Sequence, residues 1–351
     1  MMRIAVIGGD GIGPEVTGAG MKVLEAAATE DSALDLEFTE FPWGCEHYLE
    51  HGRMMAEDGL ETLRGFDAIY LGAVGWPTVP DHVSLWNLLI PIRRTFDQYA
   101  NIRPARLLRG VESPLKNPGA LDVTVVRENT EGEYSDSGGR LFTGTPNELA
   151  IQDSVFTRRG LERIIRHAFT LAGTRRGRVT GATKSNGISI TMPFFDEVFR
   201  EIAQEYPGVE ASLMHADALA ARLVLDPEGF DVVVGSNLLG DILSEVTAAT
   251  AGAIGIAPSA NLNPAGEHPS LFEPIHGSAP DIAGRGVANP AGAIWAGAMM
   301  LEHAGHETTA ARIVEALEAT LESGVKTRDL GGEATMDEVT DAVVERLRNA
   351  V

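Results

Sequence analysis

The sequence predicts an α/β fold that is divided into two domains. Strand-like runs of aliphatic residues alternate with segments of helical periodicity, which favours a helix-covered sheet over an all-β fold. The strand-like runs are residues 4–7, 68–71, 123–126, 179–182 and 232–234. The chain has 351 residues, more than a single hydrophobic core usually holds, and two domains are therefore expected.

The first strand leads into a glycine-rich turn, GGDGIGPE, at residues 8–15. Pro14 fits the first turn of a helix, glycines let a ligand approach the backbone, and a helix N-terminus favours an anion. The run lacks the GxGxxG pattern, so the usual dinucleotide-binding motif is absent. A tight turn without a ligand explains the run equally well.

Two helices are predicted from their caps. Thr157 precedes apolar residues at helical spacing, and Thr335 with Glu338 has the spacing of a capping box. The expected buried positions are Leu161, Ile164, Ile165 and Ala168 in the first helix, and Val339, Ala342, Val343 and Leu347 in the second. Residues 134–153 are rich in Gly, Ser, Thr and Asn, and we interpret them as either an exposed hairpin or a surface loop.

The chain is strongly acidic, with 28 basic and 50 acidic residues and a net charge of −22. Such a surface repels nucleic acid and anionic lipid, so neither is an expected partner. The longest nearly apolar stretch, residues 292–301, is too short to cross a bilayer. A single cysteine, Cys45, cannot form an internal disulfide, and a cytoplasmic protein is expected.

An acidic surface also repels an anionic substrate, which makes clustered arginines informative. The cluster is Arg93, Arg94, Arg103 and Arg106. Arginine can hold a carboxylate through two parallel hydrogen bonds, so the cluster predicts a di-acid substrate.

Asp241 and Glu245 lie four residues apart, on one face of a predicted helix. Their oxygen ligands suit Mg²⁺ or Mn²⁺. For an isolated pair a solvated acidic face is the stronger interpretation, but the small apolar residues 248–253 and the absence of a basic neighbour favour the cation. Oxidation of a small di-acid beside a metal is therefore the predicted chemistry.

Two further polar segments follow strand-like runs. Lys184, at the end of one run, can act as a general base or simply reach the surface. Residues 127–134 form a polar loop that ends in Tyr134, a candidate proton donor, although polar loops after strands are common.

Six motifs have an order and spacing that are not generic. They are GDGIGPEV from Gly9, LLIPIRRTFDQYANIRP from Leu88, RENTEGEY from Arg127, TKSN from Thr183, NLLGDILSE from Asn237 and FEPIHGSAPDIAGRGVANP from Phe272. Through them the chain resembles the β-decarboxylating 2-hydroxyacid dehydrogenases, which include isopropylmalate, isocitrate, homoisocitrate, tartrate and D-malate dehydrogenases. The resemblance reaches residues 327–332. Residues 75–77, residues 81–86 and the run from Ser259 are most similar to the tartrate and D-malate branch.

The resemblance implies a fold of two α/β domains around an active-site cleft, as in isopropylmalate dehydrogenase, and not a Rossmann fold. The first, cofactor-side domain would combine residues 1–100 and 252–351, and the second would hold residues 101–251. The segment near residues 134–153 would be an intersubunit clasp. The implied enzyme is a homodimer with shared active sites, to which the partner subunit contributes Lys184 and Asp217.

The resemblance also assigns roles to matching residues. The implied catalytic residues are Tyr134, Lys184 and Asp217, the metal ligands are Asp217, Asp241 and Glu245, and the carboxylate-binding residues are Arg93, Arg103 and Arg127. The cofactor would contact Gly11, Ile12, Asn186, Glu273, His276, Gly277, Asp281, Ile282 and Asn289. The implied cofactors are NAD and a divalent cation, Mn²⁺ or Mg²⁺. K⁺ is a further candidate ion.

The acidic side chain of Asp281 favours NAD⁺ over NADP⁺, because a carboxylate accepts from ribose hydroxyls and repels a 2′-phosphate. For His276 the alternative is a loop histidine capped by its own turn. One residue departs from the family pattern GDILSD: Glu245 replaces the last aspartate and extends the carboxylate by one methylene.

The residues that would face the C3 substituent are expected to determine which substrate binds. They are Trp86, Asn87, Leu89 and Ile90. A bulky Trp86 would fill the space of a branched alkyl group and leave room for hydrogen or hydroxyl, whereas core packing is its alternative role.

Three functions are compatible with the sequence. The first is NAD-dependent oxidation of D-malate to pyruvate and CO₂, or of tartrate. The others are 3-isopropylmalate dehydrogenase of leucine biosynthesis and a non-catalytic regulatory subunit of an isocitrate dehydrogenase-type complex.

Overall fold

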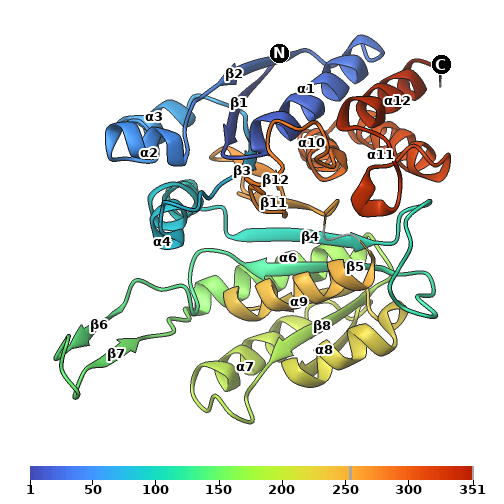
Figure 1. The fold of residues 1–351 in the computed structure, drawn as a ribbon. Helices are drawn as coiled ribbons and strands as arrows, with labels where there is room; N and C mark the ends of the chain where they lie inside the picture. The colour runs from blue at the N-terminus through green and yellow to red at the C-terminus, as the bar shows by residue number, and fades with distance from the viewer. Residues whose placement is uncertain (253–254, 350–351) are drawn as a thin grey trace. The chain divides into compact units, whose positions relative to one another are not determined.

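The computed structural model describes residues 1–252 and 255–349, which belong to two compact units (Figure 1). Unit 1 combines Met1–Gln98, Arg106–Pro114 and Ala251–Val351, and unit 2 combines Tyr99–Ala105 and Leu115–Thr250. Residues 106–114 thus fold with unit 1, whereas the sequence placed them in the second domain. The reason lies in their contacts, since Arg109 pairs with Glu315 and Glu322.

Five strands of unit 1 adjoin in the order β2-β1-β3-β12-β11. They are β1 (Met2–Gly9), β2 (Leu36–Glu40), β3 (Ala68–Ala73), β11 (Pro258–Leu262) and β12 (Ser270–Pro274). β1 is parallel to β2 and β3, and β12 is parallel to β3 but antiparallel to β11. The strands β11 and β12, which follow unit 2 in the sequence, therefore extend a sheet that the N-terminal strands begin.

The helices of unit 1 come from both ends of the chain. They are α1 (Gly13–Thr29), α2 (Cys45–His51), α3 (Gly59–Leu63), α4 (Asp81–Ser84), a π-helical turn (Leu85–Leu89), α5 (Ile90–Thr95), α10 (Ala291–His303), α11 (Glu307–Glu322), a 3₁₀ turn (Arg328–Leu330) and α12 (Met336–Asn349). The apolar stretch at residues 292–301 lies in α10, which is buried against α1, α11 and β12. No helix in the described residues has the length and apolarity needed to cross a membrane.

Unit 2 contains five strands that adjoin in the order β4-β5-β10-β8-β9. They are β4 (Ala100–Arg106), β5 (Asp122–Glu128), β8 (Arg178–Thr183), β9 (Glu210–His215) and β10 (Val232–Gly235). The pairs β5–β10, β10–β8 and β8–β9 are parallel. Because helices cover both faces, β5 and β10 are buried throughout or nearly so, which explains their continuous valine runs.

The helices of unit 2 are α6 (Arg158–Gly173), α7 (Thr191–Ala203), α8 (Ala216–Leu225), a 3₁₀ turn (Pro227–Gly229) and α9 (Asn237–Thr250). α6 packs on α7, α8 packs on α9, and α9 lies against β5 and β10 (Figure 1). The core beneath α8 and α9 includes Val123, Val233, Leu219 and Leu243. This packing fixes the position of α9 relative to the end of β5.

Both predicted caps are confirmed. The Thr157 hydroxyl accepts from the Gly160 amide at 2.9 Å before α6. Thr335 and Glu338 form a reciprocal capping box, with the Glu338 amide 3.3 Å from the Thr335 hydroxyl. One buried position was predicted wrongly, because Val344 is buried in α12 while Ala342 is only half-buried. All five predicted strands are also confirmed, within β1, β3, β5, β8 and β10.

Residues 134–153 contain a hairpin and not an irregular loop. Its strands are β6 (Gly138–Leu141) and β7 (Leu149–Gln152), which pair antiparallel. Both strands are exposed along their whole length, and the hairpin carries the exposed apolar side chains of Leu141, Phe142 and Ile151. Its role as an intersubunit clasp remains a prediction.

Candidate active site

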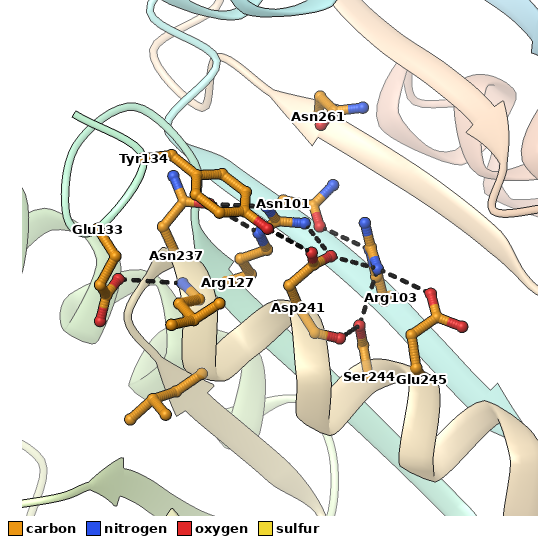
Figure 2. Close-up of polar contacts among 12 residues, drawn as sticks. Asn101, Arg103, Arg127, Glu133, Tyr134, Asn237, Asp241, Ser244, Glu245 and Asn261 are labelled. Atoms are coloured by element: carbon orange, nitrogen blue, oxygen red, sulfur yellow. Dashed lines mark hydrogen bonds and ion pairs between the residues drawn. The ribbon is translucent and has the colours of Figure 1, made fainter. Parts of the chain in front are cut away.

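Three elements of unit 2 place charged side chains at one spot (Figure 2). Arg103 lies in β4, and Arg127 is the penultimate residue of β5. Asp241 and Glu245 lie one helical turn apart on α9. α9 approaches β5 closely because residue 240 is glycine: a Cβ there would lie only 2.6 Å from the Arg127 Cβ. Any larger residue would move the carboxylates away from the arginine.

Arg127 is almost completely buried, with 2% of its surface exposed. Its Nε and Nη2 donate to the Asn237 Oδ1 at 3.1 and 2.7 Å, and its Nη1 donates to the Asp241 Oδ1. Asn237 and Asp241 sit one turn apart on α9. The guanidinium is therefore held in one orientation by a single helix.

Arg103 approaches the same helix one turn further along. Its Nη1 lies 3.1 Å from the Asp241 Oδ1, 3.3 Å from the Glu245 Oε1 and 2.9 Å from the Ser244 Oγ. Its Nε donates to the Asn101 Oδ1 at 2.9 Å. Two guanidiniums and two carboxylates thus form one charged cluster, with side chains that are 12% exposed at Arg103 and 51% exposed at Glu245.

The Tyr134 hydroxyl joins this cluster by donating to the Asp241 Oδ2 at 2.9 Å (Figure 2). Burial raises the pKa of Tyr134, and the adjacent Asp241 charge and hydrogen bond raise it further, while Arg127 and Arg103 oppose the shift. The phenol therefore keeps its proton in the neutral range. Burial also raises the pKa of Glu245, against the pull of Arg103. A bound cation would favour the charged form of this carboxylate.

Lys184 and Asp217 form a second, separate pair in unit 2. The Lys184 Nζ donates to the Asp217 Oδ1 at 2.7 Å, and this hydrogen bond lowers the pKa of Asp217. Within the described part of the chain no three acidic, histidine or cysteine side chains form a group that could hold a metal. The predicted ligands Asp217, Asp241 and Glu245 are thus not one cluster within a single chain.

In unit 1 the predicted substrate residue Arg93 pairs with the predicted cofactor residue Glu273. The Arg93 Nη2 lies 3.1 Å from the Glu273 Oε1, and both side chains are only 9% exposed. The same Glu273 oxygen accepts from the Asn261 Nδ2 at 2.7 Å. Sequence reasoning missed Asn261, because a buried asparagine on a strand carries no spacing signal.

The glycine-rich turn and the HGSAPDIAG segment of unit 1 pack against each other. The Ile12 amide donates to the Ser278 carbonyl at 2.8 Å, and a Cβ on Gly11 would lie 1.9 Å from that carbonyl. Gly11 also has a φ of +60°, so glycine is required there. The two motifs that the sequence assigned to the cofactor therefore share one surface.

His276 lies at the start of this segment. Its Nδ1 is 3.0 Å from the Gly277 carbonyl, and its Nε2 is buried without a hydrogen-bond partner among the described residues. Burial lowers the pKa of His276, so the ring is neutral. A neutral imidazole with one unused nitrogen fits a polar ligand group, such as an adenine or ribose edge.

The remaining predicted cofactor residues are Asn289, Asp281, Ile282 and Asn186. The Asn289 Nδ2 donates to the Asp329 Oδ2 at 2.9 Å, and its Oδ1 accepts from the Ala291 amide at the start of α10. Asp281 is exposed and Ile282 half-buried, in the turn after Ala279. Asn186 is exposed in unit 2, in the turn that follows Lys184.

The predicted substrate-selecting residues lie in the π-helical turn and the start of α5. Trp86 is half-buried, and the Arg94 Cζ lies 5.1 Å from its ring centroid. Asn87 is exposed, whereas Leu89 packs on the core of unit 1 and Ile90 is buried. Of these four side chains, Asn87 is thus the most accessible to a ligand.

Known proteins share both the sequence and the fold of this chain. Residues 3–343 match the family model described as isocitrate/isopropylmalate dehydrogenase. The chain is 55% identical to a probable tartrate dehydrogenase/decarboxylase of Bacillus subtilis, covering 99% of this chain and 98% of the relative. It is also 55% identical to the D-malate dehydrogenase (decarboxylating) of Escherichia coli, covering 97% of each. The crystal structure of isocitrate dehydrogenase from Methylococcus capsulatus matches with a TM-score of 0.89 at 35% identity, covering 99% of this chain and all of that one.

Proposed function

The chain belongs to the isocitrate/isopropylmalate dehydrogenase family, and from this premise we propose that it oxidises and decarboxylates D-malate or tartrate with NAD⁺. The observation that carries the proposal is the cluster of Arg103, Arg127, Tyr134, Asp241 and Glu245, which combines carboxylate-binding, cation-binding and proton-donating groups. The 55% identity to two relatives named for tartrate and D-malate supports the choice of substrate.

The two carboxylates of α9 suit a hard divalent cation. Asp241 and Glu245 share a helix face, and Glu245 remains half-exposed, so oxygen ligands are available. When bound, Mn²⁺ or Mg²⁺ would polarise the C2 oxygen of the substrate and stabilise the charge that develops there. A third carboxylate, Asp217, would come from the partner subunit in the proposed homodimer, because one chain does not bring it to Asp241 and Glu245.

Arg103 and Arg127 would hold the carboxylates of the di-acid. Both are nearly buried and are fixed by Asn101, Ser244 and Asn237, so little side-chain freedom is lost when a substrate binds. Guanidinium geometry favours bidentate binding of a carboxylate, which a lysine cannot reproduce. The acidic surface elsewhere would leave this cluster as a local site for an anion.

Lys184 and Tyr134 would move the protons. Lys184 of the partner subunit would accept the C2 hydroxyl proton while hydride leaves C2 for NAD⁺. Loss of CO₂ from the resulting β-keto acid leaves an enolate, and the Tyr134 hydroxyl would protonate it at C3. For D-malate the balanced products are pyruvate, CO₂ and NADH. The raised pKa of Tyr134 keeps the proton on the phenol until this step.

NAD⁺ is the proposed cofactor because Asp281 places a carboxylate in the segment that also holds His276. A 2′-phosphate beside an unneutralised carboxylate is unfavourable. The orphaned Nε2 of His276 and the close contact of Gly11 with Ser278 fit a nucleotide on this surface.

The proposal is tested by following NADH at saturating Mn²⁺ with D-malate, tartrate, isopropylmalate and isocitrate in parallel. We expect the highest kcat/KM with D-malate or tartrate, and a marked preference for NAD⁺ over NADP⁺. A higher kcat/KM with isopropylmalate would assign the leucine-pathway function instead. No turnover with any of the four, in protein shown to be folded, would favour a regulatory subunit.

A further inference from the structure

The loop that carries Tyr134 is joined to the helix that carries Asp241 at several points. The Asn237 side chain donates from Nδ2 to the Glu131 carbonyl at 3.0 Å. The next anchor is Glu133, whose Oε1 accepts from the Ser236 Oγ at 2.7 Å and whose Oε2 accepts from the Leu238 amide at 3.0 Å. Figure 2 shows the Glu133 side chain at the start of α9, beside Tyr134.

We propose that Glu133 is a positioning residue that holds the Tyr134 hydroxyl on Asp241 by tying the loop to the first turn of α9. This inference rests on the proposed function, in which Tyr134 donates a proton. It adds a residue that has no contact with the reacting atoms and acts through its neighbour.

The geometry of two adjacent residues supports the proposal. Glu133 binds the start of α9, and Tyr134 binds Asp241 on the same helix at 2.9 Å. Two neighbouring residues thus bind one rigid helix at two points, which fixes the backbone between them. Without the Glu133 contacts, the nearest remaining hydrogen bond from the loop to the first turn of α9 would be the one between Asn237 and the Glu131 carbonyl, two residues further from Tyr134.

The Glu133 carboxylate is also well matched to its partners. The Leu238 amide is one of the first-turn groups of α9 that have no acceptor within the helix, and a negative charge is favourable at that end. Ser236 is 1% exposed, so its hydroxyl has little access to water as an alternative acceptor. Removal of either acceptor leaves a donor without its partner, which costs more than the hydrogen bond itself is worth.

The test compares Glu133→Gln with a matched helix-cap variant, Thr335→Ala. Glutamine keeps the size of the side chain but supplies one acceptor oxygen instead of two. Thr335 caps α12 in unit 1 together with Glu338, and α12 carries none of the proposed site residues. We expect Glu133→Gln to lower kcat by about tenfold with little change in KM, because a misplaced general acid loses part of its contribution. Thr335→Ala should lower the melting temperature and leave kcat unchanged.

A double-mutant cycle separates positioning from a general loss of stability. If Glu133 acts through Tyr134, adding Glu133→Gln to Tyr134→Phe should change kcat by less than about twofold, because the hydroxyl is already gone. An undiminished tenfold loss in that background would overturn the proposal. If Glu133→Gln does not fold, Glu133→Asp serves in the same cycle, since it retains the charge but withdraws the carboxylate by one methylene.

A crystal structure of the variant gives an answer that does not depend on turnover. We expect the Tyr134 hydroxyl to leave Asp241 in Glu133→Gln. A hydroxyl that stays within hydrogen-bond distance of Asp241 would refute positioning by Glu133. A parent protein without dehydrogenase activity would refute the proposed function, while this distance would still decide the role of Glu133.

Discussion

The buried carboxyl group of Glu128 should make the stability of unit 2 depend on pH near neutrality. Glu128 ends β5, and burial raises its pKa from 4.5 to about 7, although amide hydrogen bonds from Thr130 and Glu131 oppose the shift. The Arg163 Nη2 is 3.9 Å away and instead donates to the Thr130 Oγ1 at 2.7 Å, so it compensates the carboxylate weakly.

The size of the effect follows from the difference between the folded and unfolded pKa values. Because the folded pKa is higher, the folded state binds the proton more tightly, and the stabilisation is complete below the unfolded value. It is lost as the pH rises through about 7. A difference of roughly 2.5 pKa units corresponds to about 3 kcal/mol between the two limits.

The perturbation is Glu128→Gln, which keeps one carbonyl acceptor and cannot ionise. We expect the free energy of unfolding of the parent, relative to this variant, to fall by about 3 kcal/mol between pH 4 and pH 8.5. Urea unfolding of both proteins across this range measures the difference, and subtraction cancels the titration of all other groups. Glu162→Gln, at a half-buried position on α6 where the carboxylate pairs with Arg158, is the control and should show no such trend. Parallel curves for parent and Glu128→Gln would refute the assignment of a perturbed Glu128.

Three further predictions address the charged cluster. Arg103→Lys should lower kcat/KM for the di-acid by tenfold or more, because lysine cannot form the two parallel hydrogen bonds of a guanidinium. The control Arg109→Lys, which alters a solvent-exposed ion pair, should have the kcat/KM of the parent. Equal kinetics for both variants would remove Arg103 from the site. Glu245→Ala should raise the Mn²⁺ concentration needed for half-maximal rate, whereas Glu245→Asp should retain activity. Superimposable Mn²⁺ titrations of the parent and Glu245→Ala would show that Glu245 is not a metal ligand. Lys184→Ala and Tyr134→Phe should each retain only low activity, and mixing their subunits should raise the activity above that of either variant in hybrid dimers. No increase in hybrids verified by mass would indicate self-contained sites.

Strands that are buried on both faces could be predicted from sequence, because burial demands continuous aliphatic residues. This holds for β5 and β10, whose valines are covered on both sides. β2 and β9 could not be found in this way, since these outer strands contain glutamates and are largely exposed. β12 could not be predicted for a different reason: Ser270 and Glu273 interrupt its apolar pattern. Both side chains form hydrogen bonds inside unit 1.

The site was predictable only where contacts are local in sequence. Helical periodicity places Asp241 and Glu245 on one face, as the structure shows. Spacing alone cannot reveal that Arg103 contacts Glu245, because that contact depends on where α9 lies against the sheet of unit 2. Nor can it identify Asn237 and Glu133, whose importance comes from which side chains they touch and not from their residue type.

The composition of unit 1 from distant segments has a consequence for synthesis on the ribosome. Residues 115–250 of unit 2 are consecutive, so this unit can fold while the rest of the chain is still being made. Unit 1 must wait, because β3 acquires its neighbour β12 only after unit 2 has been synthesised. Until then β3 has an unpaired edge and the apolar face of α1 lacks α10 and α12. Until β12 and the last helices emerge, the early chain therefore exposes a strand edge and an apolar helix face, features that favour aggregation.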